Sequence, residues 1–144
     1  MYSAFIQVAR ARQGIGRVEL PREWVEKAEF LLRDAEGHLK EGVYWIVCFE
    51  AQQAAELCLE ALHLALTALQ PYTHDLVELL ESLTDAGLEP PEELYTYADA
   101  LTPHYTMARY PGMKPVRYDG GLAERCLKYA RRIIEWVKEE AAKG

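Results

Sequence analysis

The chain has 144 residues, half of them hydrophobic and 27% charged, with a net charge of −7. This length suits one domain, and this composition excludes an intrinsically disordered protein. No apolar run reaches the roughly 18 residues of a membrane span and no signal peptide is visible, so we expect a cytoplasmic protein without a membrane partner.

Residues 1–20 form an arm that we separate from a domain at residues 21–144. Phe5 and Val8 give the arm a short apolar pattern, and several arginines make it basic. We expect the apolar pair to pack on the domain or on a partner subunit. A flexible phosphate-binding tail is the alternative.

The first predicted helix begins at Pro21, a residue that suits the first helical position because it lacks an N–H group. Apolar residues then repeat at intervals of three and four as far as Lys40. Within this helix, Arg33 and His38 have the spacing of a known ribonuclease signature. Five residues correspond to about 140° around a helix, so we interpret the two as separate surface residues.

The second helix is predicted from Gly42 to Gln70 and is the centre of the fold. In its first half Trp45 and Phe49 occupy the sector that is polar further along, so we expect this half to be covered on every side. Four neighbouring helices can hardly cover so wide an apolar band, which predicts a homodimer. Glu50 lies among apolar residues, so it needs a partner or lies at a subunit boundary. The second half carries a narrow polar stripe: Gln53, Glu56, Glu60, His63 and Thr67.

The three cysteines are interpreted as reduced thiols of a cytoplasmic protein. Cys48 and Cys58 lie on one helix about 15 Å apart, too far for a disulfide. Neither they nor Cys126 has the local spacing of a metal site, so we expect no metal and no cofactor.

Pro71 is expected to end the central helix. Thr73 is the predicted N-cap of the next helix, with Asp75 in the first turn, where the helix dipole favours a carboxylate. Gly87 is expected to stop this short helix.

Pro90 and Pro91 precede a fourth helix, which Pro103 should kink just before His104. A last helix is predicted from Asp119 to about Ala142. The fold class is therefore all-α, a single up-and-down bundle of about five helices.

Charge is segregated along the chain. Residues 41–108 contain twelve acidic side chains and no Lys or Arg, whereas residues 109–132 contain seven basic side chains against two acidic ones. We interpret this as acidic and basic helices that pair with each other within or between subunits. A face that attracts phosphates is the alternative.

Arg109 centres the candidate site, because its planar guanidinium suits a phosphate or a carboxylate. Neighbouring side chains could stack a nucleotide base and hold its phosphate. We nevertheless predict that Arg109 anchors its loop to the central helix by pairing with Glu56, and a ligand-binding arginine is the alternative. The candidate nucleotide-binding residues are His104, Tyr105, Arg109, Tyr110, Lys114, Arg117 and Tyr118.

Three short motifs resemble the HEPN domain, whose name stands for higher eukaryotes and prokaryotes nucleotide-binding. They are QQAAE at 52–56, THDL at 73–76 and Tyr105-x3-Arg109-Tyr110-Pro111. The resemblance covers roughly residues 22–140 and implies a helical bundle that usually dimerises. Small stand-alone members of that family often pair with a minimal nucleotidyltransferase in a toxin–antitoxin-like module. We interpret the polar residues of the first two motifs as an interhelical network and not as a catalytic set: Gln52, Gln53, Glu56, His74 and Asp75.

Some branches of that family are metal-independent ribonucleases with an Arg-x(4–6)-His motif. Here no histidine follows Arg109, because Lys114, Pro115 and Val116 occupy that window. We therefore expect a homodimeric nucleotide- or RNA-binding module with no catalytic residues. The alternative is a ribonuclease that uses Arg109 with His104 or His74.

Overall fold

The computed structural model describes residues 17–112 and 116–143. Two features expected from the sequence lie outside these ranges, namely the apolar pair Phe5 and Val8 and the candidate site residue Lys114. The helices are α2 Arg22–Glu41, α3 Tyr44–Thr67, α4 Leu76–Asp85, α5 Glu92–Leu101, α6 His104–Met107 and α7 Gly120–Ala142. The part of the chain that is described has no strands, and the predicted all-α bundle is confirmed.

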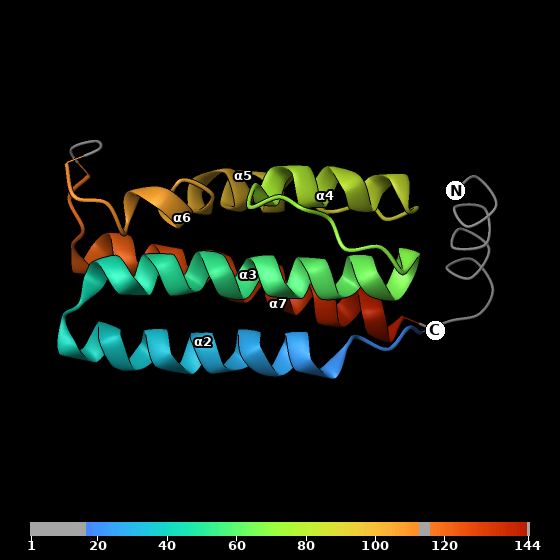
Figure 1. The fold of residues 1–144 in the computed structure, drawn as a ribbon, viewed down its shortest axis with the longest axis horizontal. Helices are drawn as coiled ribbons and strands as arrows, with labels where there is room; N and C mark the ends of the chain where they lie inside the picture. Colours follow the sequence, from blue (N-terminus) through green and yellow to red (C-terminus); the bar gives the residue numbers. More distant parts are fainter. Residues whose placement is uncertain (1–16, 113–115, 144) are drawn as a thin grey trace.

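The helices run up and down in layers around α3 and α7 (Figure 1). Helix α2 flanks this pair on one side, and α4, α5 and α6 lie on the other. Alanines at the contacts are fully buried, which lets the helices approach closely: Ala28 and Ala35 on α2, Ala51, Ala54, Ala55 and Ala61 on α3, and Ala130 on α7. None of the helices in the described ranges combines the length and apolar character that a bilayer crossing requires.

The α2–α3 hairpin depends on Gly42. Its φ of 79° lies in the left-handed region that residues with a Cβ rarely adopt. The Gly42 amide donates to the Leu39 carbonyl at 3.2 Å, and the Val43 amide donates to the His38 carbonyl at 3.0 Å. These two bonds satisfy the last carbonyls of α2 and reverse the chain.

The buried Glu50 has the partner that its position required. Its carboxylate accepts a hydrogen bond from Nδ1 of His38 at 2.8 Å, which ties α3 to α2. The sequence predicts that Arg33 and His38 are both surface residues. Arg33 is exposed as predicted, but His38 is half-buried at its contact with Glu50. The two side chains therefore do not form one site.

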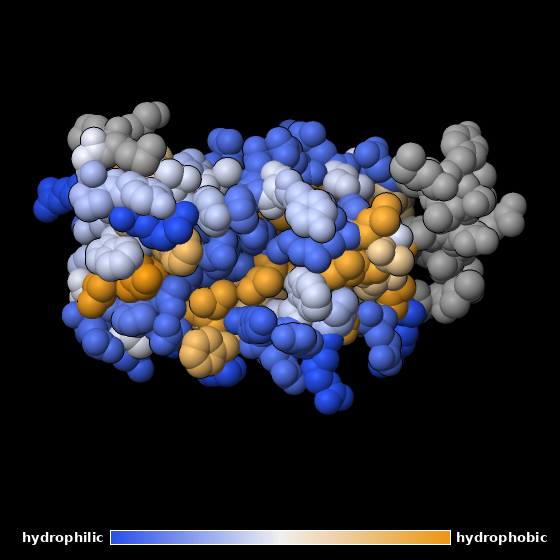
Figure 2. All heavy atoms as spheres, in the orientation of Figure 1, coloured by the Kyte–Doolittle hydropathy of each residue, from blue (hydrophilic) through white to orange (hydrophobic). Residues whose placement is uncertain are grey.

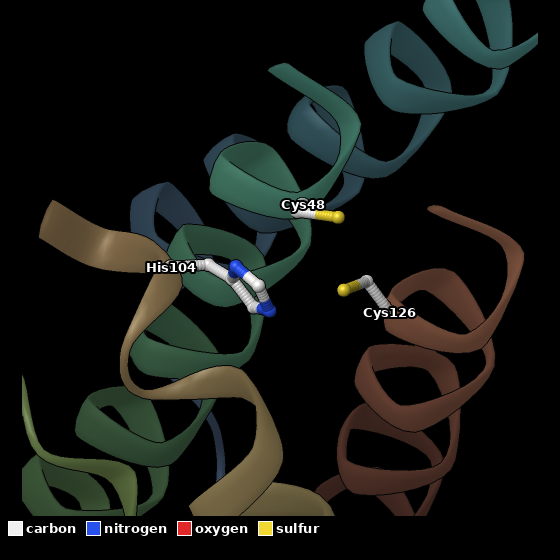
Figure 3. Close-up of side chains that lie close together, drawn as sticks. All are labelled: Cys48, His104 and Cys126. Atoms are coloured by element: carbon white, nitrogen blue, oxygen red, sulfur yellow. The ribbon is translucent and has the colours of Figure 1, made fainter. Parts of the chain in front are cut away.

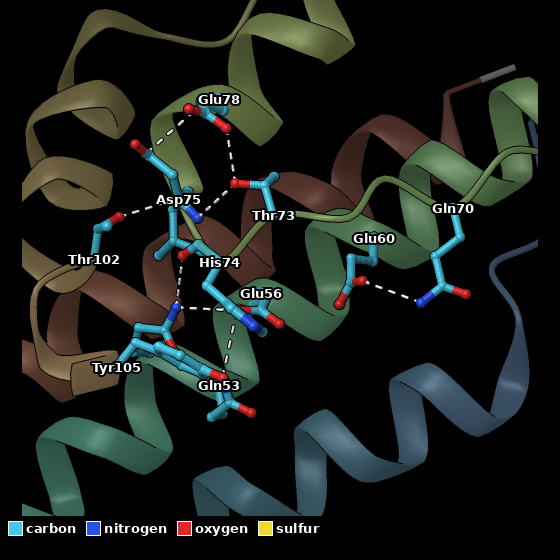
Figure 4. A network of polar contacts seen from close by, with 12 residues as sticks. Gln53, Glu56, Glu60, Gln70, Thr73, His74, Asp75, Glu78, Thr102 and Tyr105 are labelled. Carbon is cyan, nitrogen blue, oxygen red and sulfur yellow. Dashed lines mark hydrogen bonds and ion pairs between the residues drawn. The ribbon is translucent and has the colours of Figure 1, made fainter. Parts of the chain in front are cut away.

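The first half of α3 differs from the sequence expectation, and the second half is more buried than its polar stripe suggests. Trp45 is 43% exposed, so the first half is not covered on every side. In the second half the polar stripe is buried, with Glu56, Glu60 and His63 only 6–7% exposed. The reason is that residues 68–75 fold back along the stripe as an irregular segment held by side-chain hydrogen bonds (Figure 4).

Helix α3 ends at Thr67, before Pro71, because polar side chains form hydrogen bonds with the backbone groups at its last turn. The Thr67 hydroxyl donates to the His63 carbonyl at 2.8 Å and accepts from the Leu69 amide at 3.2 Å. His63 joins this end to α4 through Ser82 Oγ, 2.6 Å from its Nε2. The covering segment, residues 68–75, starts from this turn.

Pro103 divides the fourth predicted helix into α5 and the single turn α6. Thr102 and Pro103 keep helical dihedral angles, so the chain bends without leaving the helical region. Proline has no N–H, so the helical hydrogen bond that residue 103 would donate is missing. Just before it, the amide and the hydroxyl of Thr102 both donate to the Ala98 carbonyl, at 3.0 and 2.8 Å. The predicted kink is present, and it delivers His104 to the bundle interior.

Helix α7 makes an ion pair of the kind expected from the charge segregation, between Arg132 and Glu93 of α5 at 3.0 Å. Two other pairs reach α2, outside the acidic stretch of residues 41–108. Arg131 meets Glu36 at 3.0 Å, and Lys138 meets Glu29 at 3.4 Å, so both pairs link α7 to α2. Val18 donates to the Ala141 carbonyl at 2.9 Å and packs against the core. The last residues of the predicted arm therefore belong to the bundle.

Candidate functional site

A polar network joins α3 to the covering segment (Figure 4). Gln52 is fully buried, and its Nε2 donates to Glu56 Oε1 at 3.1 Å and to the His74 carbonyl at 3.0 Å. Gln53 donates to Gln52 Oε1 at 2.8 Å. Leaving such a buried amide unpaired costs about 1–3 kcal/mol, so the network fixes the path of the covering segment.

His74 is the exposed member of this network. Its Nδ1 donates to the Glu56 carboxylate at 2.9 Å, and its ring stacks on Tyr105 with the centroids 3.7 Å apart. The side chain is 54% exposed. The carboxylate favours a proton on Nδ1, and in that tautomer the other ring nitrogen, Nε2, is an acceptor.

Asp75 has a different place from the one predicted. It is the N-cap of α4, and its Oδ1 accepts from the amides of Val77 at 2.9 Å and Glu78 at 3.3 Å. Thr73, the predicted cap, instead accepts from the Asp75 amide at 3.0 Å and donates to Glu78 at 2.7 Å. The backbone is still extended at Asp75, so the helix starts too late for Thr73 to cap it.

Arg109 is held by aromatic rings and a carbonyl, and the predicted pairing with Glu56 is wrong. Its Nε donates to the Tyr105 carbonyl at 2.8 Å. Its guanidinium carbon lies 4.7, 4.8 and 5.3 Å from the ring centroids of Tyr105, Phe49 and Tyr110. Glu56 is unavailable because its carboxylate is engaged by His74 and Gln52.

A cavity of about 760 Å³ opens beside Arg109. It brings together the predicted site residues Arg109, Tyr110 and Tyr118, and adds Trp45 from the start of α3. Its wall is mostly apolar, and the remaining lining residues are Met107, Ala108, Pro111, Gly112 and Val116. Arg117 is exposed and is not part of this wall.

His104 points away from this cavity into the interior. The side chain is buried, and its Nδ1 lies 2.7 Å from the Tyr118 hydroxyl. The thiols of Cys48 and Cys126 lie beside it (Figure 3). Burial raises the pKa of Tyr118 to about 12, so this hydroxyl stays protonated. His104 therefore cannot work with Arg109 on a solvent-accessible ligand.

The two cysteine thiols lie next to each other in this cluster. The contact with Cys48 lowers the pKa of Cys126 to about 6, and the pKa of Cys48 is raised. Sequence reasoning missed this cluster, because its members come from three helices and no local spacing connects them. It also missed Trp45 and Phe49 as parts of the site, since apolar side chains on a central helix are normally interpreted as core.

Solved structures of similar proteins share this fold. A protein of Thermus thermophilus is 37% identical and superposes with a TM-score of 0.77, covering 83% of this chain and 96% of that one. An archaeal HEPN homologue is 29% identical with a TM-score of 0.68, over 83% and 96% of the two chains. An HEPN domain protein of Thermotoga maritima is 27% identical with a TM-score of 0.67, over 81% and 95%.

No curated protein matches the chain. The model of the HEPN domain family, in contrast, matches residues 21–140, which span the bundle from the start of α2 almost to the end of α7. The first two motifs form the polar network around Glu56, and the third places Arg109 at the cavity. The chain belongs to the HEPN domain family.

Proposed function

We propose that this protein is a nucleotide- or RNA-binding module whose ligand occupies the cavity beside Arg109. The observation that carries the proposal is the exposed guanidinium, held over three rings and a carbonyl and by no carboxylate among the described residues. A cation placed in this way retains donors for a phosphate. Trp45, Tyr110 and Tyr118 supply faces on which a base can stack.

The size and character of the cavity support this assignment. About 760 Å³ lies within the range of small-molecule sites, which combine mostly apolar walls with a few placed polar groups. One cation set in aromatic walls fits a ligand with a planar base and a single anchored phosphate.

Tryptophan fluorescence during titration with nucleoside mono-, di- and triphosphates and with short RNAs tests the proposal, because Trp45 lines the cavity. Losing a charge-assisted contact of about 1.5–3 kcal/mol should weaken binding in Arg109→Ala by roughly 10- to 100-fold. Arg33→Ala, an exposed arginine on α2, is the control and should bind like wild type. Equal binding by both variants and wild type would contradict the site.

A metal-independent ribonuclease is the second candidate, and one observation favours it. His74 and Arg109 both contact the ring of Tyr105. Glu56 holds Nδ1 of His74, which leaves Nε2 of this half-exposed side chain as an acceptor. A proton acceptor and a phosphate-binding cation on one platform are two of the groups that RNA cleavage needs. Incubation with mixed RNA in the presence of a chelator separates the candidates. We expect no cleavage; cleavage abolished by His74→Ala would establish the enzyme.

We also propose that the protein works as a homodimer with a nucleotidyltransferase-domain partner. Apolar side chains remain exposed over the seam between α2 and α3 (Figure 2), where Phe30 is 58% exposed. Phe30, Leu31 and Leu57 line a shallow cavity of about 500 Å³ there. Exposed apolar surface of this kind is typical of interfaces. Co-purification with a nucleotidyltransferase-domain protein tests the partner.

A further inference from the structure

Three buried side chains from three helices converge near the end of the bundle where the α2–α3 hairpin turns (Figures 1 and 3). They are Cys48 on α3, His104 at the start of α6 and Cys126 on α7, at 0, 6 and 1% exposure. One ligand atom from each lies within 4.8 Å of the others. None of the three lines the cavity at Arg109, but Tyr118, which does line it, contacts His104.

The spacing of these atoms suits a tetrahedral zinc ion. Zinc binds cysteine sulfur at about 2.3 Å and histidine nitrogen at about 2.0–2.1 Å, which places ligand atoms about 3.3–3.8 Å apart. The ligand atoms of the cluster all lie within 4.8 Å of one another, so small side-chain rotations suffice to bring them to these separations.

Ligand type and charge also favour zinc. Two thiolates and a neutral imidazole around Zn²⁺ give a group with no net charge, which the protein interior accepts at low cost. Ca²⁺ and Mg²⁺ prefer oxygen ligands, and none of the three residues offers one. Three protein donors leave one tetrahedral position for water or another small ligand.

Tyr118 is placed to orient the histidine ligand. Its hydroxyl lies 2.7 Å from His104 Nδ1, so Nε2 is the ring nitrogen left for a metal. Histidines that bind metals usually donate their other ring N–H to an oxygen, which fixes the ring and strengthens the bond. Tyr118 supplies that oxygen.

We propose that Cys48, His104 and Cys126 bind one Zn²⁺ ion, oriented by Tyr118. The ion joins α3, α6 and α7 just after the kink at Pro103, where a single turn follows the missing helical hydrogen bond. Because folding assembles the three ligands, binding of the ion adds to the stability of the folded chain.

The test uses the full chain, purified under reducing conditions. Bound metal is removed with a chelator, and the protein is then titrated with Zn²⁺ and Co²⁺. Native mass spectrometry should show one ion per chain, and the Co²⁺ form should show thiolate-to-metal charge-transfer bands. Cys48→Ser and Cys126→Ser should lose both signals. Cys58→Ser, a buried cysteine on the same helix outside the cluster, is the control and should retain them.

Tyr118→Phe gives a milder variant that keeps all three ligands. It should bind Zn²⁺ about 10- to 100-fold more weakly than wild type. If the serine variants fail to fold, the Co²⁺ spectrum of wild type and the Tyr118→Phe affinity still decide the question. Absence of one-to-one binding, a Co²⁺ spectrum without charge-transfer bands, or a Cys48–Cys126 disulfide in its place would overturn the proposal.

Discussion

At the scale of single residues, buried carboxylates set how stability depends on pH. Burial, followed by repulsion from the Glu56 carboxylate, raises the pKa of Glu60 from 4.5 to about 7. Burial likewise raises the pKa of Glu50 to about 7, although His38 partly opposes the shift. Between pH 4.5 and 7 the folded chain therefore binds more protons than the unfolded chain, so the free energy of unfolding falls as pH rises through this window.

Replacing Glu60 with Gln should flatten this dependence. Glu60→Gln removes a carboxylate that is charged in a buried place above pH 7, so its melting temperature should exceed that of wild type at pH 8 and match it near pH 4.5. Melting curves from pH 4.5 to 8 check this. Glu89→Gln, at an exposed position, should follow wild type throughout; a Glu60→Gln profile as steep as that of wild type would contradict the assignment.

The contacts of Arg109 also predict a small stability effect. An exposed cation over aromatic rings contributes about 0.5–1 kcal/mol, whereas breaking a buried ion pair from one side costs about 3–5 kcal/mol. Arg109→Ala should therefore lower the free energy of unfolding by about 1 kcal/mol or less. Urea denaturation measures it. A loss of about 3 kcal/mol or more would mean that Arg109 is a buried structural anchor.

At the scale of elements, boundaries set by local chemistry could be predicted and long-range contacts could not. Pro21, Gly87 and Asp119 end or start helices at the expected places, because caps and breakers act within one turn. The covering segment, residues 68–75, has no periodic pattern, since Gln52 and Glu56 hold it through hydrogen bonds from another helix. No pattern in the sequence therefore predicts this segment or the burial of Glu60 and His63 on the polar stripe of α3.

In the candidate site too, contacts set by local spacing could be predicted and contacts set by long-range packing could not. Tyr105 and Arg109 could be paired from their spacing of four, which is one helical turn, although α6 ends at Met107. The contribution of Phe49 and the burial of His104 depend on how α6 packs on α3, which no local pattern records.

The cap of α4 offers a test at this scale. Asp75→Ala removes the acceptor for the Val77 and Glu78 amides and should lower the free energy of unfolding by about 1 kcal/mol. Asp75→Asn keeps a capping oxygen and should lose much less. Asp85→Ala, at the other end of the same helix, is the control. Equal midpoints for Asp75→Ala and wild type in urea would mean that the cap contributes nothing.

At the scale of the whole molecule, α3 and α7 form the centre and α2 leaves an apolar seam open to solvent (Figures 1 and 2). The charged pairs between α7 and α2 are half exposed, and such pairs contribute about 0–1 kcal/mol each. Stability thus comes from the buried apolar core, and the seam remains as the surface that a second copy can cover.

Light scattering should show a homodimer at tens of micromolar. Phe30→Asp places a charge in the seam and should give a monomer with an unchanged circular dichroism spectrum. Tyr72→Asp changes an aromatic that is 95% exposed outside the seam and should remain dimeric. A wild-type chain that scatters as a monomer would refute the prediction.

The ring of Tyr105 makes positions 74 and 109 mutationally interdependent. His74 stacks on it and Arg109 lies over it, so each substitution changes the surroundings in which the other acts. The effects of changes at these two positions should therefore not add. In the evolution of related proteins, whether a substitution at position 109 is tolerated should therefore depend on which residue already stands at position 74. The order in which the two positions change then decides which substitutions are possible.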